Sequence, residues 1–193
     1  MAERTAAAET WLDEHADGVR PDEALAWFDS LPAVAPGEML GRWRGTGLPT
    51  GSPLDGLLEA YGWYGKEFID EESVHPLLFT DRSGAPRPVD PGWLPISALR
   101  DYAGFLQLWP LRTVLSSIRP LLYTDKPKAR LREISHRGVL TAAMVYDALP
   151  IIDVFRRVDD GTLLGFMDMR GLPDPFLFLL ERDGGPVSSG PAG

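Results

Sequence analysis

The fold is decided by residues 130–182, which read RLREISH (130–136), VLTAAMVYD (139–147), IIDVFRRV (151–158), TLLGFMDM (162–169) and FLFLLER (176–182). Turn residues such as Gly138 and Pro150 separate these β-rich runs, and Asp160-Gly161 lies between the third and the fourth. An Asp-Gly pair between two such runs is a strong hairpin signal. Five short strands joined by tight turns predict an antiparallel meander within a sandwich or barrel. A barrel of this size can enclose one small ligand.

The composition is that of a globular protein with one main core. The chain has 193 residues, of which 44% are hydrophobic, and this length is enough to bury a core. The net charge of −9 argues against a general affinity for nucleic acid or an anionic membrane. The chain contains no cysteine, which excludes disulfides, thiolate metal sites and cysteine nucleophiles.

The targeting signals of secreted and membrane proteins are not evident in the sequence. The first residues lack the basic and apolar regions of a secretory signal, and no run reaches the ~18 apolar residues of a spanning helix. We therefore expect a cytoplasmic protein without integral membrane association. The sequence leaves the oligomeric state open.

The first 36 residues predict two helices that cover the sheet. Residues 5–16 have a modest amphipathic pattern, and Pro21 suits the first turn of a second helix. Ala24, Trp27, Phe28 and Leu31 then follow at helical spacing and form one apolar face.

Residues 37–96 are expected to supply the first strands of the barrel. In the strand at 39–47, alternation places Trp43 on the same face as Gly41 and Gly45, which leave room for the indole. We expect Trp43 to be buried at a barrel end, against the helix that carries Trp27 and Phe28. Ser52 is expected to cap a short helix, strands are expected at 62–69 and 74–80, and 83–95 is expected to be a loop.

Three further segments complete the predicted organisation. Residues 97–128 are apolar and helical in pattern, and they are expected to form either a helix pair packed on the sheet or a lid over a cavity. The meander at 129–182 is expected to complete the same barrel. The tail at 183–193 is rich in Gly, Pro and Ser and is expected to be disordered.

Several short motifs together resemble a known family. They are Gly41-x-Trp43-x-Gly45, Trp63-Tyr-Gly-Lys66, His136-Arg-Gly138, Tyr146-Asp147, Pro150-Ile-Ile-Asp153-x-Phe-Arg156 and Gly165-x-Met-Asp168. This combination is similar to the bacterial GXWXG/DUF4334 proteins over residues 37–181. The family is largely uncharacterised, so the resemblance implies little chemistry. The fold expected for it is mainly β with helices (α+β): a calycin-like or lipocalin-like antiparallel β-barrel with N-terminal helices and an inserted helical segment.

The motifs of common cofactor sites are missing from the sequence. His15, His75 and His136 are scattered without metal-ligand spacing, so no metal is expected. Phosphate-binding glycine loops and a Gly-x-Ser-x-Gly nucleophile elbow are absent as well. Basic residues do not cluster with aromatic residues as a nucleic-acid surface requires. We therefore expect no cofactor and no nucleic-acid partner.

Polar residues nevertheless interrupt the apolar strands. Asp153 stands between Ile152 and Val154, Tyr146-Asp147 ends the apolar run 139–145, and Lys66 follows two aromatic residues. A buried charge is costly unless it is paired, so these side chains either face solvent or meet inside. Their recurrence on neighbouring strands favours a shared polar network. Strands that are apolar on both faces must be covered on both, one side lining a cavity and the other lying beneath the helices.

Three functions fit this pattern. The first is a binding or carrier protein for a small lipophilic molecule such as a fatty acid. Its candidate ligand-binding residues are Tyr146, Asp153, Arg156, Arg137, Trp43 and Met167. The second is an isomerase, cyclase or hydrolase in which Asp153 or Asp147 is the general base and Tyr146 or Lys66 the acid. The third is a scaffold without a ligand. A titratable pair within hydrogen-bond reach and pointing into a pocket would favour the enzyme, and a lone arginine over a long apolar cavity would favour the carrier.

Overall fold

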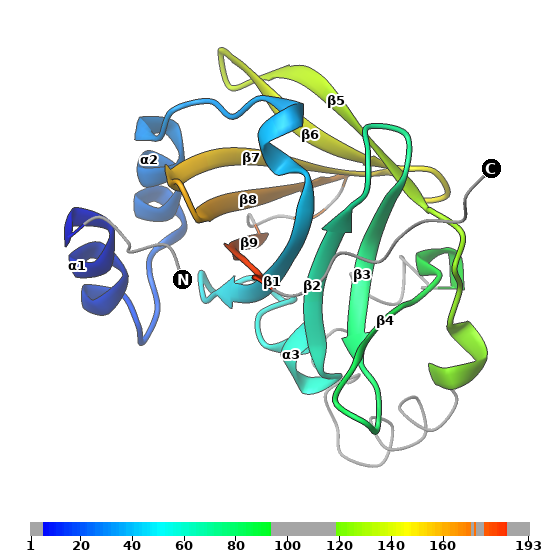
Figure 1. The fold of residues 1–193 in the computed structure, drawn as a ribbon. Coiled ribbons are helices and arrows are strands. Elements are labelled where there is room, and N and C mark those ends of the chain that lie inside the picture. Colours follow the sequence, from blue (N-terminus) through cyan, green and yellow to red (C-terminus); the bar gives the residue numbers. More distant parts are fainter. Residues whose placement is uncertain (1–5, 94–118, 171, 173–175, 185–193) are drawn as a thin grey trace.

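Antiparallel strands close into a β-barrel, and two helices cover part of its outer surface (Figure 1). The computed structural model describes residues 6–93, 119–170, 172 and 176–184. The helical elements are α1 (Ala6–Glu14), α2 (Pro21–Ser30), η1 (Pro36–Met39), α3 (Leu57–Ala60), η2 (Pro91–Trp93) and η3 (Arg119–Leu122). The strands are β1 (Gly41–Leu48), β2 (Trp63–Phe68), β3 (Val74–Thr80), β4 (Pro86–Pro88), β5 (Ala129–His136), β6 (Val139–Tyr146), β7 (Ile151–Asp159), β8 (Thr162–Met169) and β9 (Phe176–Arg182).

The order of the strands shows how the barrel closes. The sheet runs β2-β1-β9-β8-β7-β6-β5-β3-β4, and an additional pairing of β2 with β3 joins its two sides. Eight strands of the described chain thus form a closed ring, with β4 paired to β3 outside it. The predicted antiparallel barrel is confirmed, and β5 to β9 are neighbours in sequential order as expected. The predicted runs at 162–169 and 176–182 coincide with β8 and β9.

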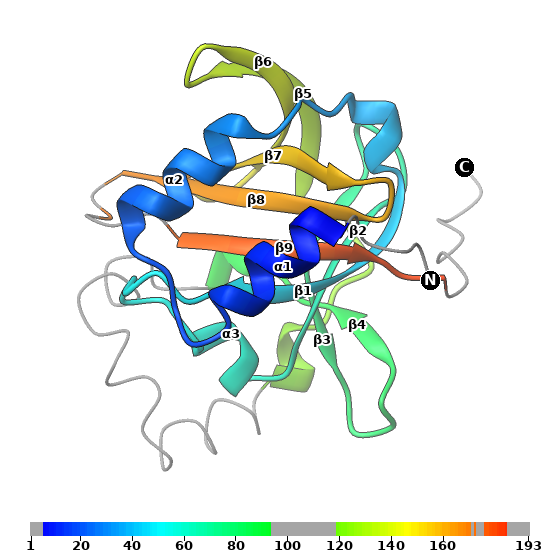
Figure 2. The same cartoon turned by 90° about the vertical axis from the view of Figure 1, so that its left-hand side faces the viewer.

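The alternation of side chains along the strands creates two apolar layers. The inner layer lies inside the barrel and includes Trp43, Leu131, Met144, Phe155 and Phe178. The outer layer lies between the helices and the barrel wall, and its buried members include Ala24, Phe28, Val154, Leu164 and Leu177. Figure 2 shows α1 and α2 lying across the strands of this wall. Because successive strand residues point to opposite faces, one strand supplies both layers.

Trp43 belongs to the inner layer, and this corrects the expected contact with α2. Its side chain is 1% exposed, its Nε1 donates to the carbonyl oxygen of Met39 at 2.7 Å, and the guanidinium of Arg182 lies 4.2 Å from its ring centroid. Phe28, in contrast, packs in the outer layer. The barrel wall therefore stands between Trp43 and α2, because the odd-numbered residues of β1 face inward.

The region between β1 and β2 also differs from the prediction. Helix α3 begins at Leu57, preceded by Gly56 with a φ of +71°, and Ser52 does not cap it. The carboxylate of Asp55 instead accepts hydrogen bonds from the backbone N–H groups of Thr50 and Gly51, both at 2.8 Å. These hydrogen bonds between a side chain and the backbone hold the segment in turns, so the helix begins later in the chain than Ser52 suggested.

The long connection after β3 is only partly a loop. Residues 86–88 pair with β3 as strand β4, and η2 follows at residues 91–93. Two prolines in β4 concealed it in the sequence, but proline is tolerated on an edge strand because one of its sides makes no ladder bonds. Most of the predicted helical insertion, residues 97–118, lies outside the described residues, as do residues 185–193 of the tail. Residues 119–122 form η3.

Candidate functional site

Three polar side chains from three strands meet inside the barrel. Lys66 comes from β2, Tyr146 from the last position of β6, and Asp153 from β7. Lys66 pairs in register with the inward-facing Trp43 of β1, so its side chain also points inward. Asp153 alternates with Ile151 and Phe155, which both pack in the inner layer. We call Lys66, Tyr146 and Asp153 the interior polar group.

The members of the interior polar group contact one another directly. Lys66 Nζ lies 2.8 Å from Asp153 Oδ2, an ion pair in which the two side chains are 3% and 1% exposed. The Tyr146 hydroxyl lies 3.4 Å from Lys66 Nζ and 3.5 Å from Asp153 Oδ2. Lys66 Nζ also donates to the carbonyl oxygen of Pro76 at 3.1 Å. The sequence expectation that polar strand residues meet inside therefore holds for these three.

Aromatic rings surround the lysine of the group. Lys66 Nζ lies 4.9 Å from the ring centroid of Phe178 and 5.7 Å from those of Trp63 and Tyr146. A cation within about 6 Å of a ring face is attracted by the ring quadrupole. The ammonium is therefore stabilised by both a carboxylate and π-electrons, in an environment that is otherwise apolar.

Burial also shifts the protonation of the other two members. It raises the pKa of Asp153 above its ordinary value, because the charged carboxylate is removed from water, and the ammonium of Lys66 partly offsets this. Burial raises the pKa of Tyr146 well above its ordinary value, and the charge of Asp153 adds to the shift. Tyr146 is therefore a phenol at neutral pH and can donate a hydrogen bond.

One atom of the group is unsatisfied. Asp153 Oδ1 is buried and has no hydrogen-bond partner among the described residues. Buried polar atoms are paired in the large majority of cases, so each exception requires an explanation. Asp153 Oδ1 is therefore a free acceptor, whereas Oδ2 of the same carboxylate contacts both Lys66 and Tyr146.

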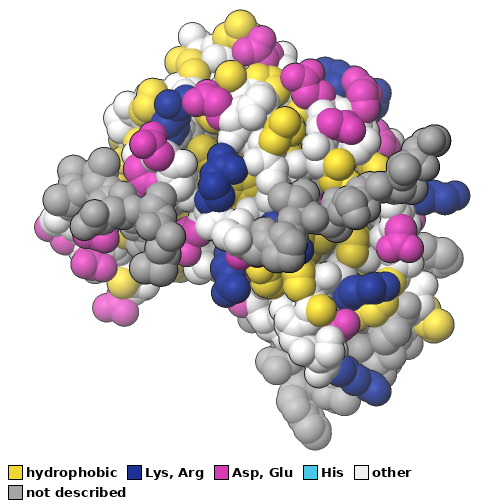
Figure 3. Space-filling model, in the orientation of Figure 1, with side chains coloured by type: hydrophobic (Ala, Val, Ile, Leu, Met, Phe, Trp, Pro, Cys, Tyr) yellow, Lys and Arg dark blue, Asp and Glu magenta, His cyan; other side chains and the backbone are white. Residues whose placement is uncertain are grey.

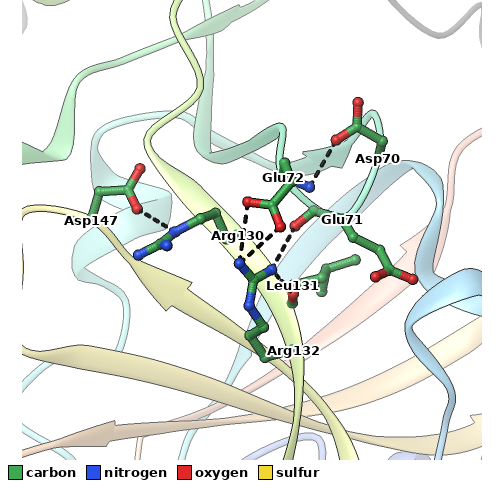
Figure 4. A network of polar contacts seen from close by, with 7 residues as sticks. All are labelled: Asp70, Glu71, Glu72, Arg130, Leu131, Arg132 and Asp147. Carbon is green, nitrogen blue, oxygen red and sulfur yellow. Dashed lines mark hydrogen bonds and ion pairs between the residues drawn. The ribbon is translucent and has the colours of Figure 1, made fainter.

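Asp147 and Arg137 lie outside the barrel, although the sequence suggested both. Asp147 accepts a hydrogen bond from Arg130 Nε at 2.9 Å, and these two side chains are 42% and 45% exposed (Figure 4). Arg137 makes a bidentate contact with Asp29 at 2.6 Å, and both side chains are about 40% exposed. Arg137 directly follows β5 and Asp147 directly follows β6, so neither lies within a strand of the barrel wall.

Arg156 is buried, but in the outer layer. Its guanidinium lies 5.2 Å from the ring of Phe28 on α2, and its Nη2 donates to the carbonyl oxygen of His136 at 3.3 Å. It stands three positions after Asp153 on β7, and an odd separation along a strand places two side chains on opposite faces. The structure therefore separates Arg156 from the interior polar group. Met167 packs half-buried against the inner layer.

The sequence reasoning missed Phe178 and undervalued Trp63. Both rings occupy space that a neighbouring glycine leaves free. A Cβ atom at Gly165 would lie 2.4 Å from the ring of Phe178, and one at Gly45 would lie 2.2 Å from the ring of Trp63. Gly165 and Phe178 are also directly opposite each other in the β8–β9 ladder. A glycine opposite an aromatic residue on an apolar strand was therefore the available signal.

A hollow lies near the other end of β7, away from the interior polar group. It has a volume of about 210 Å³ and is lined by Val34, Glu38, Trp43, Arg157, Asp159, Asp160, Leu163 and Arg182. Charged side chains dominate this lining, and Arg157 and Glu38 already pair within it. Its composition differs from the apolar surroundings of the interior polar group.

Metal-binding clusters and membrane-spanning helices do not occur in the described part of the chain. There, no three His, Asp or Glu side chains gather closely enough to hold a metal ion. None of the described helices is long and apolar enough to cross a membrane. On the face shown in Figure 3, acidic and basic side chains are interspersed among the coloured residues and do not gather into one basic surface.

Comparison with known proteins places this geometry in a family. Residues 26–84 match the family model described as GXWXG protein, and residues 127–182 match the domain of unknown function DUF4334. A crystal structure of a protein from Thermomonospora curvata is 32% identical, with a TM-score of 0.66 over 91% of this chain and 98% of that one. The chain belongs to the GXWXG/DUF4334 family. No curated protein matches it.

The structure explains the motif for which the GXWXG family is named. Gly41 adopts a φ of +116°, a conformation that L side chains rarely adopt, where the chain enters β1. Trp43 fills the inner layer, and Gly45 leaves the space that the ring of Trp63 occupies. The motif therefore packs two tryptophans inside the barrel, and one of them lies against Lys66.

Proposed function

We propose that this GXWXG/DUF4334 protein binds a small, largely apolar molecule inside its barrel. A hydroxyl or N–H group of the ligand donates a hydrogen bond to Asp153 Oδ1. The observation that carries the proposal is the interior polar group, whose carboxylate keeps a free, buried acceptor among aromatic side chains. Apolar linings with a few placed polar groups are typical of small-molecule sites.

Stability alone is a poor explanation for the Lys66–Asp153 pair. Both side chains are almost fully buried, and the desolvation of two such charges offsets much of their attraction. Apolar residues of similar volume would fill the same space without that penalty. A buried pair with a spare acceptor is more readily explained by a ligand that completes it, since perturbed titratable groups cluster at functional sites.

The charges of the interior polar group determine which polar group a ligand can carry. Lys66 is already paired with Asp153, and Arg137 and Arg156 lie outside the interior. A fatty-acid carboxylate would therefore lie beside the carboxylate of Asp153 without a free cation to bind it. An alcohol, a phenol or an amide fits better, because each offers a donor and carries no negative charge.

A second candidate function is proton transfer on the same ligand. Lys66, Tyr146 and Asp153 lie within hydrogen-bond reach of one another, and burial raises the pKa of Asp153 above its ordinary value, which makes the carboxylate a stronger base. An isomerase of a lipophilic substrate would use Asp153 as the base and Tyr146 as the proton donor. Tyr146→Phe would then retain binding and lose product formation, as followed by mass spectrometry of the ligand.

Ligand titrations test the binding proposal. Tryptophan fluorescence is followed while decanol, geraniol or cinnamyl alcohol is added, and the best binder is compared with its methyl ether. Loss of the donor should weaken binding about 10- to 100-fold, the effect of a ~1.5–3 kcal/mol hydrogen bond to a charged group. Arg156→Met is the control and should bind equally well, because Arg156 lies in the outer layer.

The outcomes separate the candidate functions. Equal affinity for the alcohol and its ether would show that Asp153 accepts no hydrogen bond from the ligand. Weaker binding by Arg156→Met would move the site to the outer layer. If none of the alcohols binds, a scaffold without a ligand would be favoured over a binding protein.

A further inference from the structure

We propose that Lys66 forms a Schiff base with a lipophilic aldehyde inside the barrel, with Asp153 as its counterion. This inference rests on the proposed function, because it assigns the same interior site to carbonyl compounds. It follows from the position of the amine and not from the free acceptor alone.

Lys66 differs from the other lysines of the chain in its surroundings. The sequence contains three lysines, Lys66, Lys126 and Lys128. Lys126 is exposed, and Lys128 pairs with Asp90 at the surface with a quarter of its side chain exposed. Lys66 alone among them is enclosed by apolar rings, the environment in which lysines act as Schiff-base nucleophiles.

The interior polar group contains the amine, the proton acceptor and the proton donor that imine formation needs. Asp153 Oδ2, at 2.8 Å, can take a proton from the ammonium and leave the neutral amine. The amine nitrogen then bonds to the carbonyl carbon, and the carbonyl oxygen becomes the hydroxyl of a carbinolamine. The Tyr146 hydroxyl lies 3.4 Å from Nζ and can deliver a proton to that hydroxyl as it leaves. The proton held by Asp153 then passes to the Tyr146 oxygen, 3.5 Å from Oδ2, so that Tyr146 is again a phenol and Asp153 again a carboxylate. One water is released for each imine formed.

The charges are the same before and after the reaction. The reactants are an ammonium, a carboxylate and a neutral aldehyde, and the products are a protonated imine, a carboxylate and water. The ion pair with Asp153 therefore persists, and no additional charge is created in the apolar interior. Exclusion of bulk water from the barrel also protects the imine from hydrolysis.

Reductive trapping tests the inference. The protein is incubated with decanal, geranial or cinnamaldehyde and sodium cyanoborohydride, and the modified lysine is located by peptide mass spectrometry. At limiting aldehyde, Lys66 should carry at least about tenfold more adduct than Lys126, a preference worth ~1.4 kcal/mol. Excess of the matching alcohol should suppress the adduct at Lys66 and leave that at Lys126 unchanged.

A variant and a spectrum provide independent readouts. Lys66→Met combined with Asp153→Leu removes both charges, so neither is left buried without its partner, and it should lose the interior adduct. Lys126→Arg is the matched control and should retain it. Before reduction, bound geranial should absorb at longer wavelength than free geranial, because its imine is protonated.

Failure of the inference and failure of the proposed function give different results. If the alcohols bind but Lys66 carries no more adduct than Lys126, the proposed binding function stands and the Schiff base is refuted. If neither alcohols nor aldehydes bind, both are refuted. If excess alcohol leaves the Lys66 adduct unchanged, the reaction does not occur in the ligand site and the inference fails.

Discussion

Removing Lys66 should expose the energetic cost of the buried carboxylate. In Lys66→Met, Asp153 keeps only the Tyr146 hydroxyl at 3.5 Å and loses the ammonium at 2.8 Å. Breaking a buried pair on one side typically costs ~3–5 kcal/mol, because the remaining charge is left uncompensated. Asp153→Leu should cost a similar amount, since it leaves the ammonium of Lys66 with the Pro76 carbonyl and the aromatic rings.

The double variant should behave differently from the sum of the single variants. Lys66→Met combined with Asp153→Leu places two apolar side chains in an apolar interior, and such replacements are often neutral or stabilising by ~1–4 kcal/mol. We therefore expect the double variant to be within ~1 kcal/mol of the natural protein or more stable. The free energies of unfolding are measured by urea titration with circular dichroism.

A surface pair supplies the matched control. Arg130 and Asp147 also lie 2.9 Å apart, but their side chains are 45% and 42% exposed. The same set of variants at this pair should give a coupling energy of no more than ~1 kcal/mol. The contrast tests burial as the cause, because the two pairs have similar N···O distances and differ in exposure.

The pH dependence of Lys66→Met adds a second signature. Without the ammonium, burial raises the pKa of Asp153 further, so the carboxyl is more easily protonated in the folded than in the unfolded state. A raised pKa means that stability is present below the unfolded value of about 4 and is lost as the pH rises through the folded value. The loss of unfolding free energy in Lys66→Met should therefore grow with pH.

A double variant as unstable as either single variant would refute the reasoning, because the two side chains would then contribute through packing and not through their charges.

Three further predictions concern packing and protonation. Trp43→Ala should lower the free energy of unfolding by ~3–5 kcal/mol, because the side chain is 1% exposed, and a loss under ~0.5 kcal/mol in urea titration would show that it is not packed. Gly45→Ala should cost ~1–3 kcal/mol because its Cβ would overlap the ring of Trp63, whereas Gly37→Ala, with open space around it, should stay within ~0.5 kcal/mol; equal losses would contradict this packing. Burial lowers the pKa of His75, so stability is present above the unfolded value of about 6.5 and is lost as the pH falls through the folded value. His75→Gln should flatten this acid-side loss in thermal unfolding, and an unchanged slope would exclude His75 as its source.

The strands could be predicted because their signals are local. Each run in 130–182 ends at a turn residue, and alternation within a run separates its two faces. Alternation does not say which face is inside. Asp153 and Arg156 stand an odd number of positions apart, so parity alone already excluded a shared cavity for them.

The interior contacts depend on closure of the barrel. Lys66 reaches Asp153 from β2, a strand that is far from β7 in the order of the sheet. Only the pairing of β2 with β3 brings the two sides together, and nothing in the sequence of either strand specifies that distance. Trp43 was predicted to be buried, and it is, but its neighbours depended on the same closure. The helical insertion predicted over 97–118 lies outside the described residues and stays a prediction.

Native mass spectrometry tests the central claim most directly. The natural protein and the Lys66→Met/Asp153→Leu variant are purified in parallel from the original host, incubated with the alcohol panel and ionised under gentle conditions. We predict one small molecule bound to each natural chain, released intact on activation, and a loss of at least about tenfold in occupancy for the variant. Equal occupancy of the two proteins, or none on the natural protein, would contradict a binding site at the interior polar group.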